Sequence, residues 1–198
     1  MFSPMKLCGK ECNYLKINDN LELSAELTEF LSKPENMYLW KLDTSRQTVV
    51  HSLRHTEAIH LRIPKNPELT PIEMCNIHEI IDSELLEIPI FKKTMDWIIQ
   101  SLKQSGADTV ELGRVFFSNH HASSIIDEHT DVGRYFRYYD RFHFTIDQIN
   151  DKNIFYIRDE PLMLQLGNLY WINNHVSHRL QNLSDQDRIN LIVDARLL

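Results

Sequence analysis

The part of the sequence that begins at Val110 consists of short runs rich in Val, Ile, Phe and Tyr, separated by Gly, Asn and Asp at fairly regular intervals. Runs of this kind predict β-strands joined by tight turns. A long succession of short strands is typical of an antiparallel sandwich or barrel. The runs are VELGRVFFSNH, SSIIDEHTD, YFRYYDRFHFTI, NIFYIRDE, LMLQLGNLYWI, HVSHRLQNL and RINLIVDARLL.

The length of the chain predicts a single domain. With 198 residues, of which 42% are hydrophobic, the chain can bury one substantial core, because a domain of this size removes roughly 70% of its unfolded surface from water. We expect one domain over residues 1–198, with helices and flanking strands in residues 1–109 and the β core in residues 110–198. The predicted fold class is therefore α+β, mainly β, with N-terminal helices packed on a β-barrel.

Two segments of the N-terminal part have apolar residues at helical spacing. The segment NDNLELSAELTEFLSK predicts a helix that ends before Pro34. The segment FKKTMDWIIQSLKQSG has one apolar face and predicts a second helix that stops at Gly106. Between them, residues 36–64 mix aromatic and β-branched residues with polar ones and predict strands that end at Pro64.

The charge of the chain argues against nucleic acid as a partner. The formal net charge is -7, and no run of Lys and Arg is long enough to neutralise a phosphate backbone. The N-terminus lacks the apolar stretch of a signal peptide, and no segment approaches the roughly 20 apolar residues of a membrane span. We therefore expect a cytoplasmic protein that binds a small molecule or a peptide, with no membrane partner. The sequence does not predict the oligomeric state.

Three cysteines, Cys8, Cys12 and Cys75, are an odd number and do not form a paired zinc pattern. A metal site made by Cys8 and Cys12 is one reading of their close spacing. Free thiols in a reducing compartment are the expectation that we favour.

Residues 135–146 alternate in polarity and predict a strand with two different faces. The apolar face suits a hydrophobic layer, and the polar face suits either solvent or a polar cavity. The polar face holds Tyr135, Arg137, Tyr139, Arg141, His143 and Thr145, and the apolar face holds Phe136, Tyr138, Phe142, Phe144 and Ile146.

A candidate metal site begins with the H-x-D pair of His129 and Asp131. At a strand end, two residues that are two apart point the same way, so both can reach one ion. The strongest candidate for a third ligand is His178, although spacing alone does not exclude the nearby His175. Two histidines and one carboxylate form the facial triad of non-haem Fe(II) oxygenases, which leaves coordination positions open for substrate and dioxygen.

Arg188 lies ten residues beyond His178 on the last predicted strand. On that strand Arg188, Asn190 and Ile192 share one face. An arginine that points into a protein interior must be paired with an anion, because burying an unpaired charge is costly. The anion is either a ligand carboxylate, which a guanidinium binds with two hydrogen bonds, or an internal Asp or Glu.

The order of these motifs resembles the aspartyl/asparaginyl β-hydroxylase family of Fe(II)- and 2-oxoglutarate-dependent dioxygenases. The motifs are H-x-D at His129, R-x-H at Arg141, GNLYWINN, H-x-x-x-N at His178 and the arginine at position 188, and the resemblance covers roughly residues 112–196. It implies a double-stranded β-helix, a cupin-like jelly roll. It also selects His178 over His175, because only His178 is followed by Asn182 and Arg188 at the family's spacing.

The resemblance implies a role for each matching residue. His129, Asp131 and His178 match the metal ligands, and Arg188 matches the arginine that binds the C5 carboxylate of 2-oxoglutarate. The resemblance also implies Fe(II), 2-oxoglutarate and dioxygen as cofactor and cosubstrates, and hydroxylation of an unactivated C–H bond. The other residues that it places in the cosubstrate pocket are Arg141, His143 and Ser118.

The prime substrate is not fixed by these motifs. The resemblance permits a free amino acid, another small amine-containing metabolite, or an Asp or Asn side chain in a protein, and we favour the small molecules. Weak candidates for substrate contacts are His60, Arg62, Arg137 and Trp171, and candidates for orienting the histidine ligands are Asn173 and Asn174.

Two other functions would use part of the same residues. A non-catalytic cupin-like module could bind a metal or a small acid through the histidines, but it would not need Arg188, Arg141 and His143 together. A zinc hydrolase would need a general base such as Glu128 or Asp127, and it would leave Arg188 unexplained.

Overall fold

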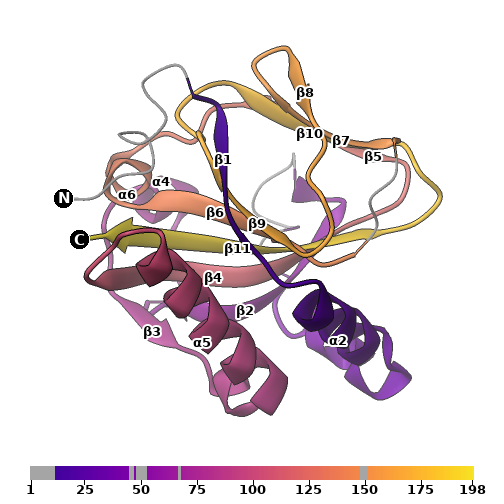
Figure 1. Cartoon of the computed structure of the whole chain (residues 1–198), viewed down its shortest axis with the longest axis horizontal. Helices are drawn as coiled ribbons and strands as arrows, with labels where there is room; N and C mark the ends of the chain where they lie inside the picture. Colours follow the sequence, from indigo (N-terminus) through magenta and orange to yellow (C-terminus); the bar gives the residue numbers. More distant parts are fainter. Residues whose placement is uncertain (1–11, 45–46, 48–52, 67, 148–150) are drawn as a thin grey trace.

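The protein consists of two antiparallel β-sheets, and helices α2 (Leu21–Ser32) and α5 (Pro89–Gln104) lie on the outer side of the larger one (Figure 1). The computed structural model describes residues 12–44, 47, 53–66, 68–147 and 151–198. The larger sheet contains β1 (Tyr14–Asp19), β2 (Thr56–Pro64), β3 (Ile80–Asp82), β4 (Val110–His120), β6 (Asp140–Thr145), β9 (Asn168–Ile172) and β11 (Arg188–Leu197). The smaller sheet contains β5 (Ser124–His129), β7 (Asn153–Ile157), β8 (Glu160–Leu162) and β10 (His178–Asn182).

The strand order agrees with a jelly roll. It is β1-β9-β6-β11-β4-β2-β3 in the larger sheet and β5-β10-β7-β8 in the smaller sheet. The mainly β fold with supporting N-terminal helices is therefore confirmed. One detail is corrected: among the described residues the two sheets share no strand, so they form a double-layered jelly roll and not a closed barrel.

The helices lie mainly in the first half of the chain. The predicted helix before Pro34 and the predicted helix that stops near Gly106 are confirmed as α2 and α5. None of the helices in the described ranges has the length and apolar character needed to cross a membrane. The helices are α2 (Leu21–Ser32), α4 (Pro71–Met74), α5 (Pro89–Gln104) and α6 (Arg134–Tyr138), with the 3-10 helices η1 (Pro34–Lys41) and η3 (Glu84–Glu87).

The main hydrophobic core lies between the larger sheet and helices α2 and α5. Helix α2 begins after Asn20, whose side chain accepts a hydrogen bond from the backbone N–H of Leu23 at 2.9 Å, and α5 begins with Pro89. Each fully buried Leu or Phe side chain contributes about 1.5–3 kcal/mol by its removal from water. The core includes Leu23, Leu27 and Leu31 of α2, Phe91, Ile98 and Leu102 of α5, and Phe117, Phe142, Phe144, Leu191 and Val193 of the sheet.

The inner face of the larger sheet is polar where it meets the smaller sheet. On β11, Leu191 and Val193 belong to the core, whereas Asn190 and Ile192 line a pocket between the sheets. The alternation predicted for β6 is confirmed from residue 141 onward, because Phe142 and Phe144 belong to the core while Arg141 and His143 line the pocket. A smaller apolar cluster lies beside this pocket and contains Phe155, Ile157, Leu162, Leu164, Tyr170, Ile172 and Leu180.

The first half of the strand predicted for residues 135–146 is wrong, because these residues form helix α6 before β6 begins. Gly133 precedes the helix with φ 114° and turns the chain. The buried Tyr135 hydroxyl then accepts a hydrogen bond from the backbone N–H of Arg114 at 2.7 Å, which fixes the helix against β4. Arg137 is consequently exposed on α6, and its side chain does not share a strand face with the pocket.

Two further expectations for the N-terminal part are corrected. Residues 34–41 form η1 and not a strand, since Pro34 starts a helical turn, whereas the strand that ends at Pro64 is confirmed as β2. Residues 45–46 and 48–52 lie outside the described residues. Cys12 is disulfide-bonded, so the expectation of free thiols fails there, while Cys75 carries a free thiol. Cys8 lies outside the described residues.

We expect Gly133→Ala to destabilise the protein. A Cβ atom at this position would overlap the backbone carbonyl oxygen of Cys75, and φ 114° is unfavourable for any residue with a side chain. The free energy of unfolding should fall by about 1–3 kcal/mol in urea denaturation. Val132→Ala is the control, because Val132 is 64% exposed and its truncation should change stability by less than about 0.5 kcal/mol. Equal stability of the two variants would contradict this account of the turn.

Candidate active site

Three potential metal ligands meet at the mouth of the pocket. One ligand atom from each of His129, Asp131 and His178 lies within 4.8 Å of the others. His129 ends β5 and His178 begins β10, and the antiparallel register of these strands places the two residues opposite each other. Asp131 follows β5 by two residues and turns its carboxylate toward the same point. Pairing of two short strands therefore creates the triad from segments distant in sequence.

Backbone carbonyl groups fix the orientation of both imidazoles. Nδ1 of His129 lies 2.7 Å from the carbonyl oxygen of Asp127, and Nδ1 of His178 lies 2.9 Å from that of Val176. A carbonyl oxygen can only accept, so Nδ1 carries the proton and Nε2 is left with a free lone pair, as a metal ligand requires. Burial lowers the pKa of His178, which also favours the neutral imidazole.

The two oxygens of Asp131 have different neighbours. Oδ2 accepts hydrogen bonds from Nη1 of Arg141 at 2.7 Å and from Nδ2 of Asn174 at 3.1 Å, while Oδ1 lies 4.0 Å from Nε2 of His129. Burial raises the pKa of the Asp131 carboxyl, but the positive charge of Arg141 and the field of His178 outweigh it, and the net pKa is lowered. The carboxylate is therefore ionised and presents Oδ1 to the histidines.

Asn173 and Asn174 do not orient the histidine ligands, which corrects that expectation. Asn174 holds the carboxylate of Asp131, and Asn173 donates to the backbone carbonyl of Cys12 at 3.2 Å. The backbone carbonyl groups of Asp127 and Val176, two residues before each histidine, already accept a hydrogen bond from Nδ1 of that histidine. The sequence contains no pattern that indicates this contact. Two neutral imidazole nitrogens and one carboxylate oxygen fit an Fe(II) ion of the facial-triad type.

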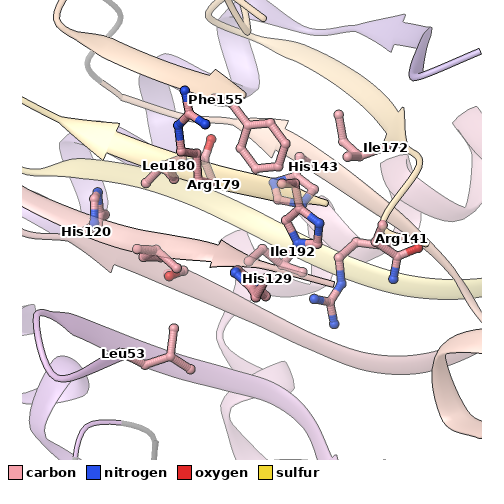
Figure 2. Close-up of a pocket in the computed structure, with 15 residues that line it drawn as sticks. Leu53, His120, His129, Arg141, His143, Phe155, Ile172, Arg179, Leu180 and Ile192 are labelled. Carbon is pink, nitrogen blue, oxygen red and sulfur yellow. The ribbon is translucent and has the colours of Figure 1, made fainter. Parts of the chain in front are cut away.

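A pocket extends from the triad between the two sheets (Figure 2). Figure 2 shows His129, His143 and Arg141 directed toward the same region of this pocket. Apolar side chains form much of its wall, so a ligand here is partly desolvated. The lining residues of the larger sheet are Ser118, His120, Arg141, His143, Ile172, Asn190 and Ile192.

Arg188 lies next to this pocket with a buried charge, and its Nη1 has no partner in the part of the chain that the structure describes. The residue is 2% exposed, and burial lowers the pKa of its guanidinium to about 10, so the group stays cationic at neutral pH. Its cross-strand neighbour His120 lines the pocket. Two oxygens on the same inner face, Oγ1 of Thr145 and Oδ1 of Asn190, also lack a partner among the described residues. The guanidinium of Arg188 and the hydroxyl of Thr145 can donate hydrogen bonds to a bound anion, whereas Oδ1 of Asn190 can only accept one.

His143 and Ser118 are buried at the wall between Arg188 and the triad. Ser118 lies opposite Asn190 in the register of β4 and β11, and His143 lies on β6. Burial and the charges of Arg141 and Arg188 hold the pKa of His143 well below its usual value. The imidazole is thus neutral and can donate or accept a hydrogen bond.

Arg141 is at the pocket, but two carboxylates occupy its guanidinium. Nη1 binds Asp131, while Nε and Nη2 bind the two oxygens of Asp194 at 2.8 and 3.1 Å. These carboxylates raise the pKa of Arg141 despite its burial. Arg141 lines the pocket, as the resemblance implies, while each nitrogen of its guanidinium binds a carboxylate oxygen.

Several other candidate residues lie away from the triad. His175 is exposed, and Glu128, a proposed base for a zinc hydrolase, is exposed and accepts a hydrogen bond from Ser177. Asp127 is also exposed. The group of three potential ligands therefore contains His178 and not His175, as the family resemblance implied, and neither acidic residue is enclosed beside it.

The weak candidates for substrate contacts have structural partners. Arg62 binds Asp82 at 2.6 Å, and the indole N–H of Trp171, which is buried in the main core, donates to Asp140 at 3.0 Å. His60 packs against the ring of Phe116, with 5.3 Å between ring centroids. None of these three residues lines the pocket described above.

Two residues at the site, His120 and Asp194, were not found from the sequence, because they carry no motif of their own. For Asn190, the alternation of β11 with Arg188 was a usable signal, because both share the inner face. Asp194 also follows this alternation, but its pairing with Arg141 depends on the register of β6 and β11.

Comparison with known proteins agrees with this geometry. No curated protein matches the chain by sequence. The viral collagen prolyl hydroxylase of Paramecium bursaria Chlorella virus-1 in complex with 2-oxoglutarate superposes with a TM-score of 0.53 at 10% identity, covering 95% of this chain and 97% of that one. A Pseudomonas putida prolyl-4-hydroxylase gives a TM-score of 0.51 at 13% identity, with coverage of 93% and 91%. The non-heme monooxygenase ThoJ gives 0.55 at 11% identity, with coverage of 93% and 74%.

These structural likenesses show the fold, and the family is shown by sequence. A family model described as Aspartyl/Asparaginyl beta-hydroxylase matches residues 89–196, which is more than half of the chain and contains the triad and Arg188. The chain belongs to the aspartyl/asparaginyl β-hydroxylase family.

Proposed function

We propose that this protein uses Fe(II) and 2-oxoglutarate to hydroxylate a free amino acid or another small metabolite. Membership of its family makes the protein a 2-oxoglutarate-dependent hydroxylase. What we propose in addition is the identity of the metal and the class of substrate. The observation that carries the proposal is that Nη1 of Arg188, buried beside a His-Asp-His triad, has no partner within the described ranges. A cation at the end of a pocket and a metal site at its mouth suit a ligand with an acid group at each end.

The protein residues would bind and orient the reactants. Arg188 would hold the C5 carboxylate of 2-oxoglutarate, with Ser118 as a hydroxyl donor beside it. The neutral His143 would give a hydrogen bond without adding charge. His129, Asp131 and His178 would occupy one face of an Fe(II) ion, which supplies the dioxygen chemistry when it is bound. Positioning is thus the main contribution of the chain.

The pocket supports a small substrate more than a folded protein. Its walls come from strands of both sheets and include apolar side chains beside the triad: Leu53, Ile126, Phe155, Ile172, Leu180 and Ile192. Such walls suit an aliphatic group that presents a C–H bond to the metal. The side chain of His129 is 41% exposed, so the mouth can be reached from solvent. The similar structures described above are those of two prolyl hydroxylases and a monooxygenase.

We expect Arg188→Ala to weaken binding of 2-oxoglutarate roughly 10–100-fold, because hydrogen bonds to a charged group contribute about 1.5–3 kcal/mol. The measurement is calorimetric titration of the Mn(II)-loaded protein with 2-oxoglutarate. Arg188→Lys should recover part of the affinity, since it keeps the charge but not the planar two-point contact. An affinity that is unchanged in Arg188→Ala would remove Arg188 from the cosubstrate site.

Asp131→Ala should abolish stoichiometric Fe(II) binding and hydroxylation, because the triad loses its only anionic ligand. His175→Ala is the matched control, and it should bind Fe(II) as the parent does. Equilibrium dialysis under anaerobic conditions measures both. Loss of Fe(II) in His175→Ala, with retention in Asp131→Ala, would mean that the triad is assigned to the wrong residues.

A screen for substrate-dependent succinate release tests the substrate class. We expect release above background with one or a few free amino acids, and no stimulation by peptides that contain the same residue within the chain. The Arg188→Ala variant provides the background. Stimulation by peptides alone would contradict the proposed small substrate while leaving the hydroxylase activity intact.

A further inference from the structure

A line of buried charged side chains runs from the metal site into the larger sheet. It consists of Asp131, Arg141, Asp194 and Arg114, and we refer to these four residues as the charge line. Asp131 and Arg141 are joined at 2.7 Å, Arg141 and Asp194 at 2.8 Å, and Nε of Arg114 lies 3.5 Å from Oδ2 of Asp194. Negative and positive charges alternate along it, so the four groups are neutral as a set.

Asp194 is the most deeply buried member of the charge line, with 1% of its surface exposed. It lies directly across from Arg141 in the register of β11 and β6, so two strands in the middle of the larger sheet hold the pair. Both oxygens of Asp194 bind the guanidinium, which leaves Arg141 one remaining nitrogen, Nη1, for Asp131. A two-point contact of this kind fixes the direction of that nitrogen.

Arg114 forms the far end of the charge line and is itself fixed. Its guanidinium carbon lies 4.0 Å from the ring centroid of Tyr135 and 5.3 Å from that of Phe136, both on helix α6. The guanidinium of Arg141 lies 5.1 Å from the ring of Phe136. The two arginines therefore pack against aromatic rings on α6, which begins three residues after Asp131. The line and the metal-ligand loop are thus one packed unit.

We propose that Asp194 is a positioning residue which, through Arg141, makes Asp131 a one-oxygen metal ligand. With Arg141 held by Asp194, Nη1 of Arg141 donates a hydrogen bond to Oδ2 of Asp131, and Asn174 donates to the same oxygen. Only Oδ1 of Asp131 then faces the histidines. Without the carboxylate of Asp194, two nitrogens of Arg141 lose their partners. The guanidinium of Arg141 is then free to rotate. Its positive charge is no longer balanced by Asp194, so it competes with the metal ion for the carboxylate of Asp131.

The same anchoring separates the tasks of the two buried arginines beside the pocket. Each nitrogen of the Arg141 guanidinium binds a carboxylate oxygen, whereas Nη1 of Arg188 has no partner among the residues described. An anionic ligand is therefore attracted to Arg188. The inference rests on the proposed metal site, but it concerns how the chain holds one ligand and does not depend on the substrate.

The test measures Co(II) binding to the apo-protein through the visible absorption of the bound ion. We expect Asp194→Asn to weaken Co(II) binding about 10–100-fold, the usual effect of losing a residue that orients a metal ligand. The intensity of the absorption bands should change as well, because the oxygen of Asp131 is no longer held in one direction. Glu111→Gln is the matched control, since Glu111 lies on β4 and accepts hydrogen bonds from the hydroxyls of Tyr138 and Tyr139. It should bind Co(II) like the parent.

A double variant separates positioning from a general structural effect. If Asp194 acts through Arg141, then Arg141→Gln combined with Asp194→Asn should bind Co(II) as Arg141→Gln does alone, because effects in series do not add. Arg141→Lys provides the test if Asp194→Asn does not fold. A lysine cannot bridge two carboxylates as a guanidinium does, so we expect a similar loss of Co(II) affinity with the charge retained.

The inference would be overturned if Asp194→Asn bound Co(II) like the parent. Where that variant does not fold, parent-like Co(II) binding in Arg141→Lys would overturn it. It would also be overturned if the losses of Co(II) affinity in Arg141→Gln and Asp194→Asn added fully in the double variant. Failure of the proposed function has a different appearance. The parent would then bind Co(II) with the expected dependence on Asp194 and Arg141, but it would not bind 2-oxoglutarate.

Discussion

The burial of the Arg188 charge, with no partner for Nη1 among the described residues, is the constraint on which the arrangement of the site depends. Burying a guanidinium with incomplete hydrogen bonding has a free-energy cost, and the inner face of the larger sheet holds this charge where apolar groups would otherwise pack. The main core, on the outer face against α2 and α5, supplies stability that offsets this cost. On the proposed function, the C5 carboxylate of 2-oxoglutarate would bind Arg188 and reduce the cost. Because the triad lies at the mouth of the same pocket, the other end of the cosubstrate would then reach the metal ion.

Two arginines on this inner face differ in what surrounds them, and the difference decides what each can do. Arg141 faces Asp194 and Asp131 and is satisfied by the protein. Nη1 of Arg188 has no partner among the described residues, and the residue opposite Arg188 on β4 is His120. Residue type alone makes the two look equivalent. The nearby carboxylates fix Arg141, which orients the metal ligand Asp131. Arg188 is left available to a bound anion.

Local patterns in the sequence predicted much of the fold. The leucine spacing of α2, the apolar face of α5 and the alternation of β6 and β11 are all confirmed, because each depends on neighbours within a few residues. Helix α6 was missed, since its formation depends on a hydrogen bond from the backbone of Arg114 to Tyr135 and on the turn at Gly133. The triad residues were found by their order and spacing. The carboxylate of Asp194 was not, because its pairing with Arg141 depends on strand register, which no single segment encodes.

Anaerobic titration of the Fe(II)-loaded protein with 2-oxoglutarate tests the central claim most directly. A 2-oxo acid that chelates Fe(II) through its keto and carboxylate oxygens gives a metal-to-ligand charge-transfer band in the visible, so the band reports binding of the cosubstrate at the triad. We predict that this band appears and saturates at one 2-oxoglutarate per iron. A protein that retains stoichiometric Fe(II) and shows no band at saturating 2-oxoglutarate would contradict it.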